Sequence, residues 1–140
     1  MLRAGGRLCV FWNVGHHPDG LAAALQAVYG RVLPPGSAAL RIGYAVNGPS
    51  DPRAGFDEVA GALVGCAELA DPRITSFPWS RTYTRDMWLD ELRSHSDHIA
   101  LASEVCERLL DEVGATIDRF GVAFDMSFAT VLVAATRARS

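Results

Sequence analysis

The sequence of 140 residues contains no lysine, so all 13 of its basic residues are arginine. Together with the many alanines and glycines, this indicates the codon bias of a GC-rich genome rather than a function. The formal net charge of −3 argues against general nucleic-acid binding, which normally requires a basic patch. The longest apolar runs, residues 8–12 and 131–135, are far shorter than the ~20 residues that cross a bilayer. We therefore expect neither nucleic acid nor a membrane as a partner.

Cysteine is also scarce. Cys9, Cys66 and Cys106 are odd in number and widely spaced, which fits neither a disulfide framework nor a zinc-ligand pattern. The amino terminus lacks the long apolar core of a signal peptide. These absences predict a cytoplasmic protein with reduced thiols, in which Cys9 and Cys66 are small buried residues. The hydrophobic fraction of 49% predicts one globular domain over residues 1–140.

Three segments have the composition of β-strands. Residues 7–13 contain a continuous apolar run, which is typical of a strand buried on both faces. Residues 74–83 alternate, but Pro78 lacks a backbone donor, so this strand belongs at a sheet edge. Residues 123–136 end in a strongly apolar stretch and are expected at the centre of the sheet.

Four segments are predicted to be helices. The amphipathic periods and the candidate caps, Asp19, Thr84 and Ser103, place these helices at residues 20–33, 56–64, 85–93 and 103–120. Residues 36–53 are rich in glycine, proline and small polar residues, and they are predicted to form an irregular insertion.

The candidate substrate site lies where the first strand ends. Ligands of open α/β sheets bind beyond the carboxyl ends of parallel strands, and here Asn13 is followed by His16 and His17. Either histidine could remove a proton from a substrate. The alternative is that both are exposed loop histidines, since no carboxylate lies beside them in the sequence. No catalytic residue is assigned.

Other candidates are weaker. His95 and His98 are three residues apart, whereas helical metal-binding pairs favour a spacing of four, and no third ligand is evident. We therefore predict no metal site there, but a polar turn in which Asp97 could pair with a histidine.

Two acidic pairs are interpreted as parts of solvent-exposed helix faces rather than as acid–base pairs; they are Asp57 with Glu58 and Asp90 with Glu91. The larger aromatic residues would form either core or an aromatic pocket; they are Trp12, Trp79, Tyr83 and Trp88.

Two segments resemble a known family. Residues 2–13, L-R-A-G-G-R-L-C-V-F-W-N, resemble the "L-R-P-G-G-R-L…F-W-N" segment of class I S-adenosylmethionine-dependent methyltransferases that act on small molecules, with Ala4 in place of the proline. Residues 83–98, Y-T-R-D-M-W-L-D-E-L-R-S-H-S-D-H, are similar to the "Y-T…W-L-x-L-L-R-T-H-S-D-H" segment of a subgroup. Residues 128–137 look like the family's last strand.

The resemblance implies an α/β fold, the carboxy-terminal part of a Rossmann-like sheet. This part holds strands five, six and seven, with the last antiparallel and between the other two. The chain would then begin at strand five and lack the cofactor-binding half. Its glycines, which include Gly15, Gly20, Gly36 and Gly43, form no cofactor-cradling pattern after a strand. No cofactor-binding residue is assigned.

The implied function is methyl transfer from S-adenosylmethionine to a small-molecule acceptor held near Asn13, His16 and His17. As a truncated protein, the chain is expected to be inactive alone and to bind the cofactor poorly. The alternative is a non-catalytic α+β module that binds a ligand or dimerises. In either case the first strand would have a free edge, through which a homodimer could form.

Overall fold

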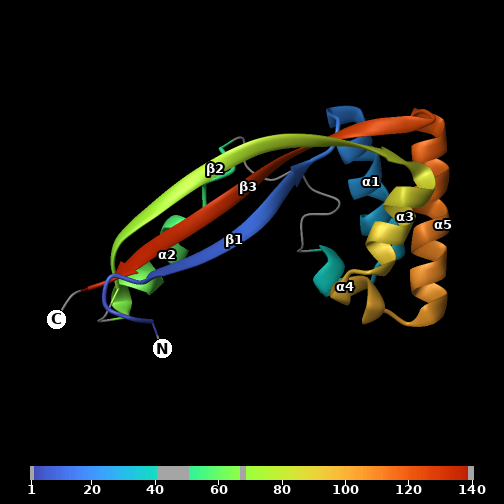
Figure 1. The fold of residues 1–140 in the computed structure, drawn as a ribbon. Coiled ribbons are helices and arrows are strands. Elements are labelled where there is room, and N and C mark those ends of the chain that lie inside the picture. Colours follow the sequence, from blue (N-terminus) through green and yellow to red (C-terminus); the bar gives the residue numbers. More distant parts are fainter. Residues whose placement is uncertain (1, 41–50, 67–68, 139–140) are drawn as a thin grey trace. The chain divides into compact units, whose positions relative to one another are not determined.

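The computed structural model describes residues 2–40, 51–66 and 69–138. It is an α/β structure with a three-stranded antiparallel sheet, whose strand order is β1-β3-β2 (Figure 1). The strands are β1 (Arg7–His16), β2 (Leu69–Thr84) and β3 (Ala123–Arg137). The predicted strand order and orientation are therefore confirmed.

The chain divides into two compact units. The sheet unit comprises Met1–Val14, Pro49–Trp79 and Phe128–Ser140, and the helical unit comprises Gly15–Gly48 and Ser80–Ser127. Each strand passes from one unit into the other along its length. The two units are described separately below.

Backbone pairing in the sheet unit joins the start of β1 to the end of β3. The Gly5 amide donates to the Arg137 carbonyl at 3.0 Å, and the Arg137 amide donates to the Gly6 carbonyl at 2.8 Å. β2 lies on the other side of β3 and carries Pro78, which is exposed. The prediction of an edge position for the proline-bearing strand is thus confirmed.

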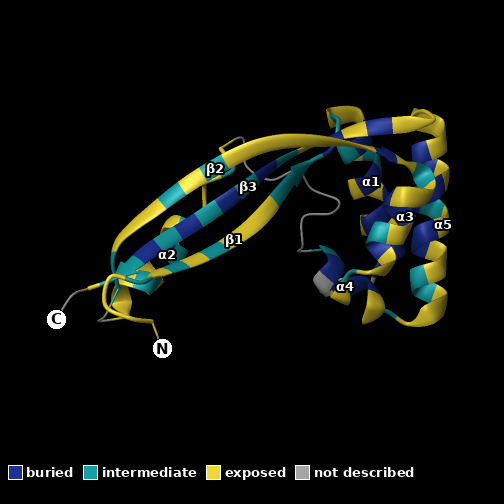
Figure 2. Ribbon diagram, in the orientation of Figure 1, coloured by how far each residue is buried: buried dark blue, intermediate teal, exposed yellow. Residues whose placement is uncertain are grey.

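The expectation that β1 is buried on both faces is wrong. None of its residues is buried, and Phe11 and Trp12 are 67% and 43% exposed (Figure 2). In the described part of the chain, β1 is an edge strand with β3 as its neighbour, so its apolar run lacks the cover of an interior strand. Cys9 and Cys66, predicted to be buried, are likewise exposed.

The prediction that the last strand lies at the centre of the sheet is confirmed, because β3 lies between β1 and β2. Along its apolar end, Val131, Val133 and Ala135 are buried whereas Leu132 and Ala134 are half-buried. This alternation is what the pleat of a strand produces, since successive side chains point to opposite faces. One face of β3 therefore supplies the buried side of the sheet.

The sheet unit also holds α2 (Asp57–Gly65), close to the predicted helix. Its start is marked by Phe56, whose ring centroid lies 5.3 Å from that of Trp12. On the neighbouring strands, Trp79 stacks on Phe128 at 4.2 Å. Asp57 and Glu58 are exposed, as predicted.

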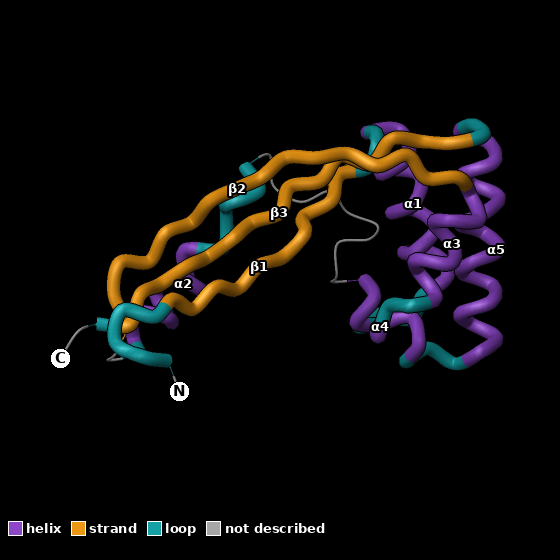
Figure 3. Tube along the Cα trace, in the orientation of Figure 1, coloured by secondary structure: helices purple, strands orange, loops and turns teal. Residues whose placement is uncertain are grey.

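The helical unit contains α1 (Asp19–Val32), η1 (Ala38–Leu40), α3 (Arg85–Arg93), α4 (Ser96–Ile99) and α5 (Ser103–Phe120). The helices α1 and α3 both pack against α5 (Figure 3). Most of the predicted apolar stripes are buried in this contact; their most buried members are Leu21, Leu25, Val28, Val32, Leu92, Leu110, Val113 and Ile117. No described helix has the length and apolar character of a membrane span.

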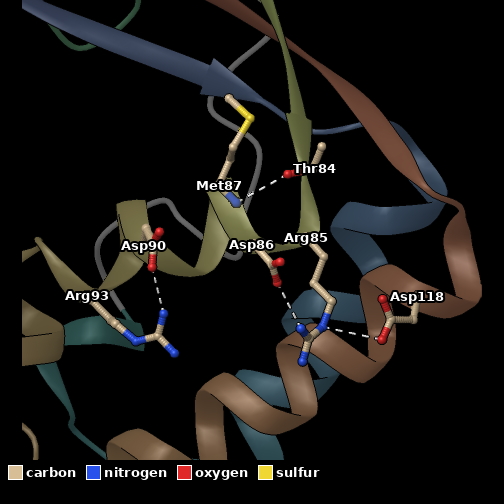
Figure 4. Close-up of polar contacts among 7 residues, drawn as sticks. All are labelled: Thr84, Arg85, Asp86, Met87, Asp90, Arg93 and Asp118. Atoms are coloured by element: carbon tan, nitrogen blue, oxygen red, sulfur yellow. Dashed lines mark hydrogen bonds and ion pairs between the residues drawn. The ribbon is translucent and has the colours of Figure 1, made fainter.

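The helix starts agree only in part with prediction. Thr84 caps α3 as expected, because its hydroxyl oxygen accepts a hydrogen bond from the Met87 amide at 3.3 Å (Figure 4). Asp19 and Ser103 are not caps. They are the first residues of α1 and α5, and the cap positions belong to Pro18 and Ala102, which make no side-chain capping bond.

An ion-pair network follows the Thr84 cap. Arg85 lies between Asp86, at 2.9 Å, and Asp118 of α5, at 3.3 Å. At the other end of α3, Arg93 pairs with Asp90 at 2.8 Å. These side chains are largely exposed, so we assign the network to orienting α3 on α5 rather than to a large share of stability.

Replacing Thr84 with alanine should lower the free energy of unfolding by about 1 kcal/mol, because one amide at the start of α3 loses its acceptor. Urea unfolding followed by circular dichroism measures this change. Ser103→Ala is the matched control, and it should cost far less because Ser103 makes no capping bond. Equal losses in the two variants would contradict the assignment of Thr84 as the cap.

The predicted irregular insertion at residues 36–53 is only partly described. Ala38–Leu40 forms the single 3-10 turn η1, and residues 51–55 form a turn before α2. Residues 41–50, among them Gly43, lie outside the described residues.

Candidate functional site

Asn13 lies on β1 in the sheet unit, where its side chain is part of a polar chain across all three strands. The Thr130 hydroxyl of β3 donates to Asn13 Oδ1 at 2.8 Å. The same hydroxyl accepts from Trp79 Nε1 of β2 at 3.0 Å. The amide oxygen of Asn13 therefore ties the strands together as well as being a candidate for substrate contact.

His16 and His17 belong to the helical unit, so the structure does not join them with Asn13 in one described site. β1 continues through His16, which is half-buried, where a loop was expected. His17 is only 3% exposed, so the interpretation of both residues as exposed loop histidines is wrong for His17. The burial results from neighbours that are far away in the sequence.

Those neighbours form an aromatic cluster of His17, Tyr83, Trp88 and Phe124. The Trp88 ring is edge-on to the rings of His17 and Tyr83, with centroids 5.0 and 5.1 Å away. Phe124 stacks at 6.0 Å from both His17 and Tyr83. Burial raises the pKa of Tyr83, so its hydroxyl remains protonated at neutral pH.

The four large aromatic residues considered as a pocket are divided between the units. Trp12 and Trp79 lie in the sheet unit and are 43% and 39% exposed. Tyr83 and Trp88 lie in the helical unit and are at most 3% exposed. Within each unit their contacts are those of packing, so the interpretation of Tyr83 and Trp88 as core residues is confirmed.

A buried polar relay was not foreseen from the sequence. Asp97 Oδ1 lies 3.2 Å from His98 Nδ1, and Tyr29 Oη lies 2.8 Å from His98 Nε2. The carboxylate accepts a hydrogen bond from Nδ1–H, so Nε2 of neutral His98 accepts a hydrogen bond from the Tyr29 hydroxyl. The relay joins α4 to α1.

The predicted pairing of Asp97 with a histidine is confirmed. The predicted polar turn is instead a short helix, in which Asp97 and His98 are buried.

Burial lowers the pKa of His98, and the hydrogen bond to Asp97 offsets part of that effect. His95 contributes a smaller lowering. His98 is therefore neutral in the folded chain at pH 7, as the relay requires.

His95 lies beside this relay. Its ring centroid is 6.2 Å from that of His98, and its Nε2 is 3.6 Å from Glu91 Oε1. Glu91 was predicted to be on a solvated face together with Asp90, but its side chain is 40% exposed and turned to His95. One ligand atom each from His95, Asp97 and His98 lies within 4.8 Å of the others. Asp97 is thus the third candidate ligand, which the sequence did not reveal.

The depressed pKa of His98 predicts that stability falls on acidification. The unfolded chain takes up a proton on His98 near the ordinary pKa of 6.5, and the folded chain does so only at lower pH. The stabilisation that neutral His98 contributes to the folded chain is therefore fully present above the ordinary pKa of 6.5. It decreases, by at most about 1.4 kcal/mol per pH unit, as the pH falls towards the folded pKa.

Urea unfolding between about pH 5 and 8 tests this prediction, because histidine is the group that ordinarily titrates there. His98→Gln should flatten the pH dependence. The same slope in His98→Gln as in the native chain would contradict the assignment to His98.

Comparison with known proteins gives no family. Neither the models of protein families nor the curated proteins contain a match to this chain.

Proposed function

We propose that this chain forms the acceptor-side part of a class I S-adenosylmethionine-dependent methyltransferase that acts on a small molecule. The observation that carries the proposal is the strand order β1-β3-β2 with an antiparallel central strand. This is the order that the resemblance implies for strands five, seven and six. The two resembling segments also lie at matching places, one on β1 and the other from the end of β2 through α4.

The described residues do not fit the cofactor itself. Gly15 lies within β1, Gly20 within α1, and Gly36 in the turn after α1 with a φ of 85°. The connection between β1 and α1 consists of His17 and Pro18, so it lacks the glycines that let a backbone approach a bound cofactor closely. We therefore assign no cofactor contact to these residues and place no step of the transfer on a bound cofactor.

The part proposed for the chain's own residues is to bind and orient the acceptor, since positioning supplies much of the rate of a displacement. His16, half-buried at the end of β1, is accessible enough to take a proton from an acceptor hydroxyl or amine. His17 is packed among aromatic rings, so its proposed part is to hold the β1–α1 connection in place.

Complementation by a cofactor-binding half tests the proposal. That half would come from a methyltransferase carrying the "L-R-P-G-G-R-L" segment, cut just before the segment. We expect the 140-residue chain alone to show no S-adenosylmethionine binding by calorimetry, and the mixture of both polypeptides to bind it. Rejoining the half with its own carboxy-terminal part is the positive control. If that control binds and the mixture does not, the proposal is wrong.

A second candidate function is a non-catalytic module that dimerises through β1. It is favoured by the edge position of β1 and by Phe11, which is 67% exposed on that strand. Light scattering after size exclusion distinguishes the candidates. A stable dimer that the cofactor-binding half cannot dissociate supports the module, and a monomer that associates with that half supports the methyltransferase.

A further inference from the structure

We propose that His95, Asp97 and His98 bind a divalent transition-metal ion, with Zn²⁺ as the best-suited ion. The three residues lie at the junction of α3 and α4, within one compact unit. Their candidate ligand atoms are all within 4.8 Å of one another. The inference is independent of the methyltransferase proposal.

The carboxylate of Asp97 gives independent support for a cation. Its side chain is 4% exposed, and Oδ1 is paired with His98. Among the residues that the structure describes, the other oxygen, Oδ2, is buried without a hydrogen-bond donor. A buried carboxylate oxygen without a donor loses the solvation it has in water. A metal ion bound by this carboxylate would offset part of the loss, because its positive charge stabilises both carboxylate oxygens.

The distances are near those of a coordination sphere. His98 Nδ1 and Asp97 Oδ1 are 3.2 Å apart. Two ligands at about 2.0–2.1 Å from one tetrahedral Zn²⁺ are separated by roughly 3.3 Å. His95, the cap residue before α4, would supply the third ligand atom, which lies within 4.8 Å of the other two. A set of two imidazoles and one carboxylate suits zinc and leaves one position for solvent.

The neighbouring groups are those that orient metal ligands. On binding, His98 would lose the proton at Nδ1 and carry one at Nε2, which would then donate to Tyr29 Oη at the 2.8 Å already observed. Such a partner for the second ring nitrogen is typical of ligating histidines. Glu91, 3.6 Å from His95 Nε2, is placed to orient the other ring. The ion would thereby fasten the α3–α4 junction to α1 through Tyr29.

Titration of chelator-treated chain with ZnCl₂ tests the site. We expect one equivalent to bind by calorimetry and to raise the melting temperature, because an ion that binds only the folded state stabilises it. Asp97→Asn and His95→Asn should each weaken binding at least about tenfold, and Tyr29→Phe about tenfold. Asp90→Asn is the matched control, since Asp90 is exposed and pairs with Arg93, and it should bind as the native chain does.

Two further measurements keep the test decisive. In the NMR spectrum, Zn²⁺ should shift the ring resonances of His95 and His98 and leave that of His16 unchanged. With Co²⁺ as the probe, the spectrum should lack a thiolate band, which excludes the exposed cysteines as ligands. If Asp97→Asn does not fold, the test uses His95→Asn, because the His95 side chain is less buried, at 14% exposure against 4% for Asp97. Absence of binding, unchanged affinity in folded variants, or a thiolate band would each overturn the proposal.

Discussion

Trp88→Ala should lower the free energy of unfolding by about 3–5 kcal/mol. Trp88 is only 2% exposed, and its ring contacts the rings of His17, Tyr83 and Phe124. Truncation removes the largest member of the aromatic cluster and leaves a cavity between α3 and the ends of two strands. A loss of this size is a large share of the ~5–15 kcal/mol that holds an ordinary domain together.

Urea unfolding followed by far-ultraviolet circular dichroism measures the loss without relying on tryptophan fluorescence. Trp12→Ala is the matched control, because Trp12 is 43% exposed and should cost far less. A loss as large for Trp12→Ala as for Trp88→Ala would show that the cluster is not the core of the helical unit.

The second large effect is expected at Leu25. Its side chain is fully buried, and α1 packs against α5, whose Leu109 and Val113 are also fully buried. Leu25→Ala should cost about 2–5 kcal/mol, the sum of lost burial and of the cavity that remains. Thermal and urea unfolding both report this loss.

The control for Leu25 is Ile99→Ala, an aliphatic truncation of the same size at a residue that is 68% exposed. It should change stability by no more than about 0.5 kcal/mol. The α1–α5 contact is not the main stabilising contact if Leu25→Ala is as mild as Ile99→Ala.

These predictions place the stable core in the helical unit and leave the sheet unit with exposed apolar side chains. Phe11 and Phe77 are 67% and 52% exposed, and both lie on edge strands. Such a surface is either covered by another polypeptide or prone to aggregation. The methyltransferase proposal covers the β1 edge with a cofactor-binding half, and the alternative covers it with a second copy.

The candidate cap residues show how much of a helix start can be predicted from the local sequence. Thr84, Asp19 and Ser103 are all good capping types, yet only Thr84 caps its helix. Around Asp19 and Ser103 the helix begins one residue earlier than the capping rule implies, so each side chain lies in the first turn instead. A difference of one residue is within the ordinary uncertainty of helix ends, but it removes the function of a cap.

The buried polar residues show the same limit more strongly. Tyr29 and His98 are 69 residues apart, and no pattern along the chain links them. Asp97 lies in a stretch of polar residues that is typical of a solvated turn, and it is nevertheless buried. His17 likewise follows an ordinary strand end, and only the approach of Trp88 and Phe124 buries it.

Local periodicity was enough to place α1, α2, α3 and α5 and the cores of the three strands, because each depends on residues within one or two turns; it missed the short helix α4 and the first five residues of β2. Pro78 was enough to assign an edge, since a missing donor has the same effect in any sheet. The exposure of β1, the His98 relay and the cluster proposed to hold Zn²⁺ were decided by the tertiary structure. Burial and ligand geometry depend on distances through space, and residues far apart in the chain determine those distances.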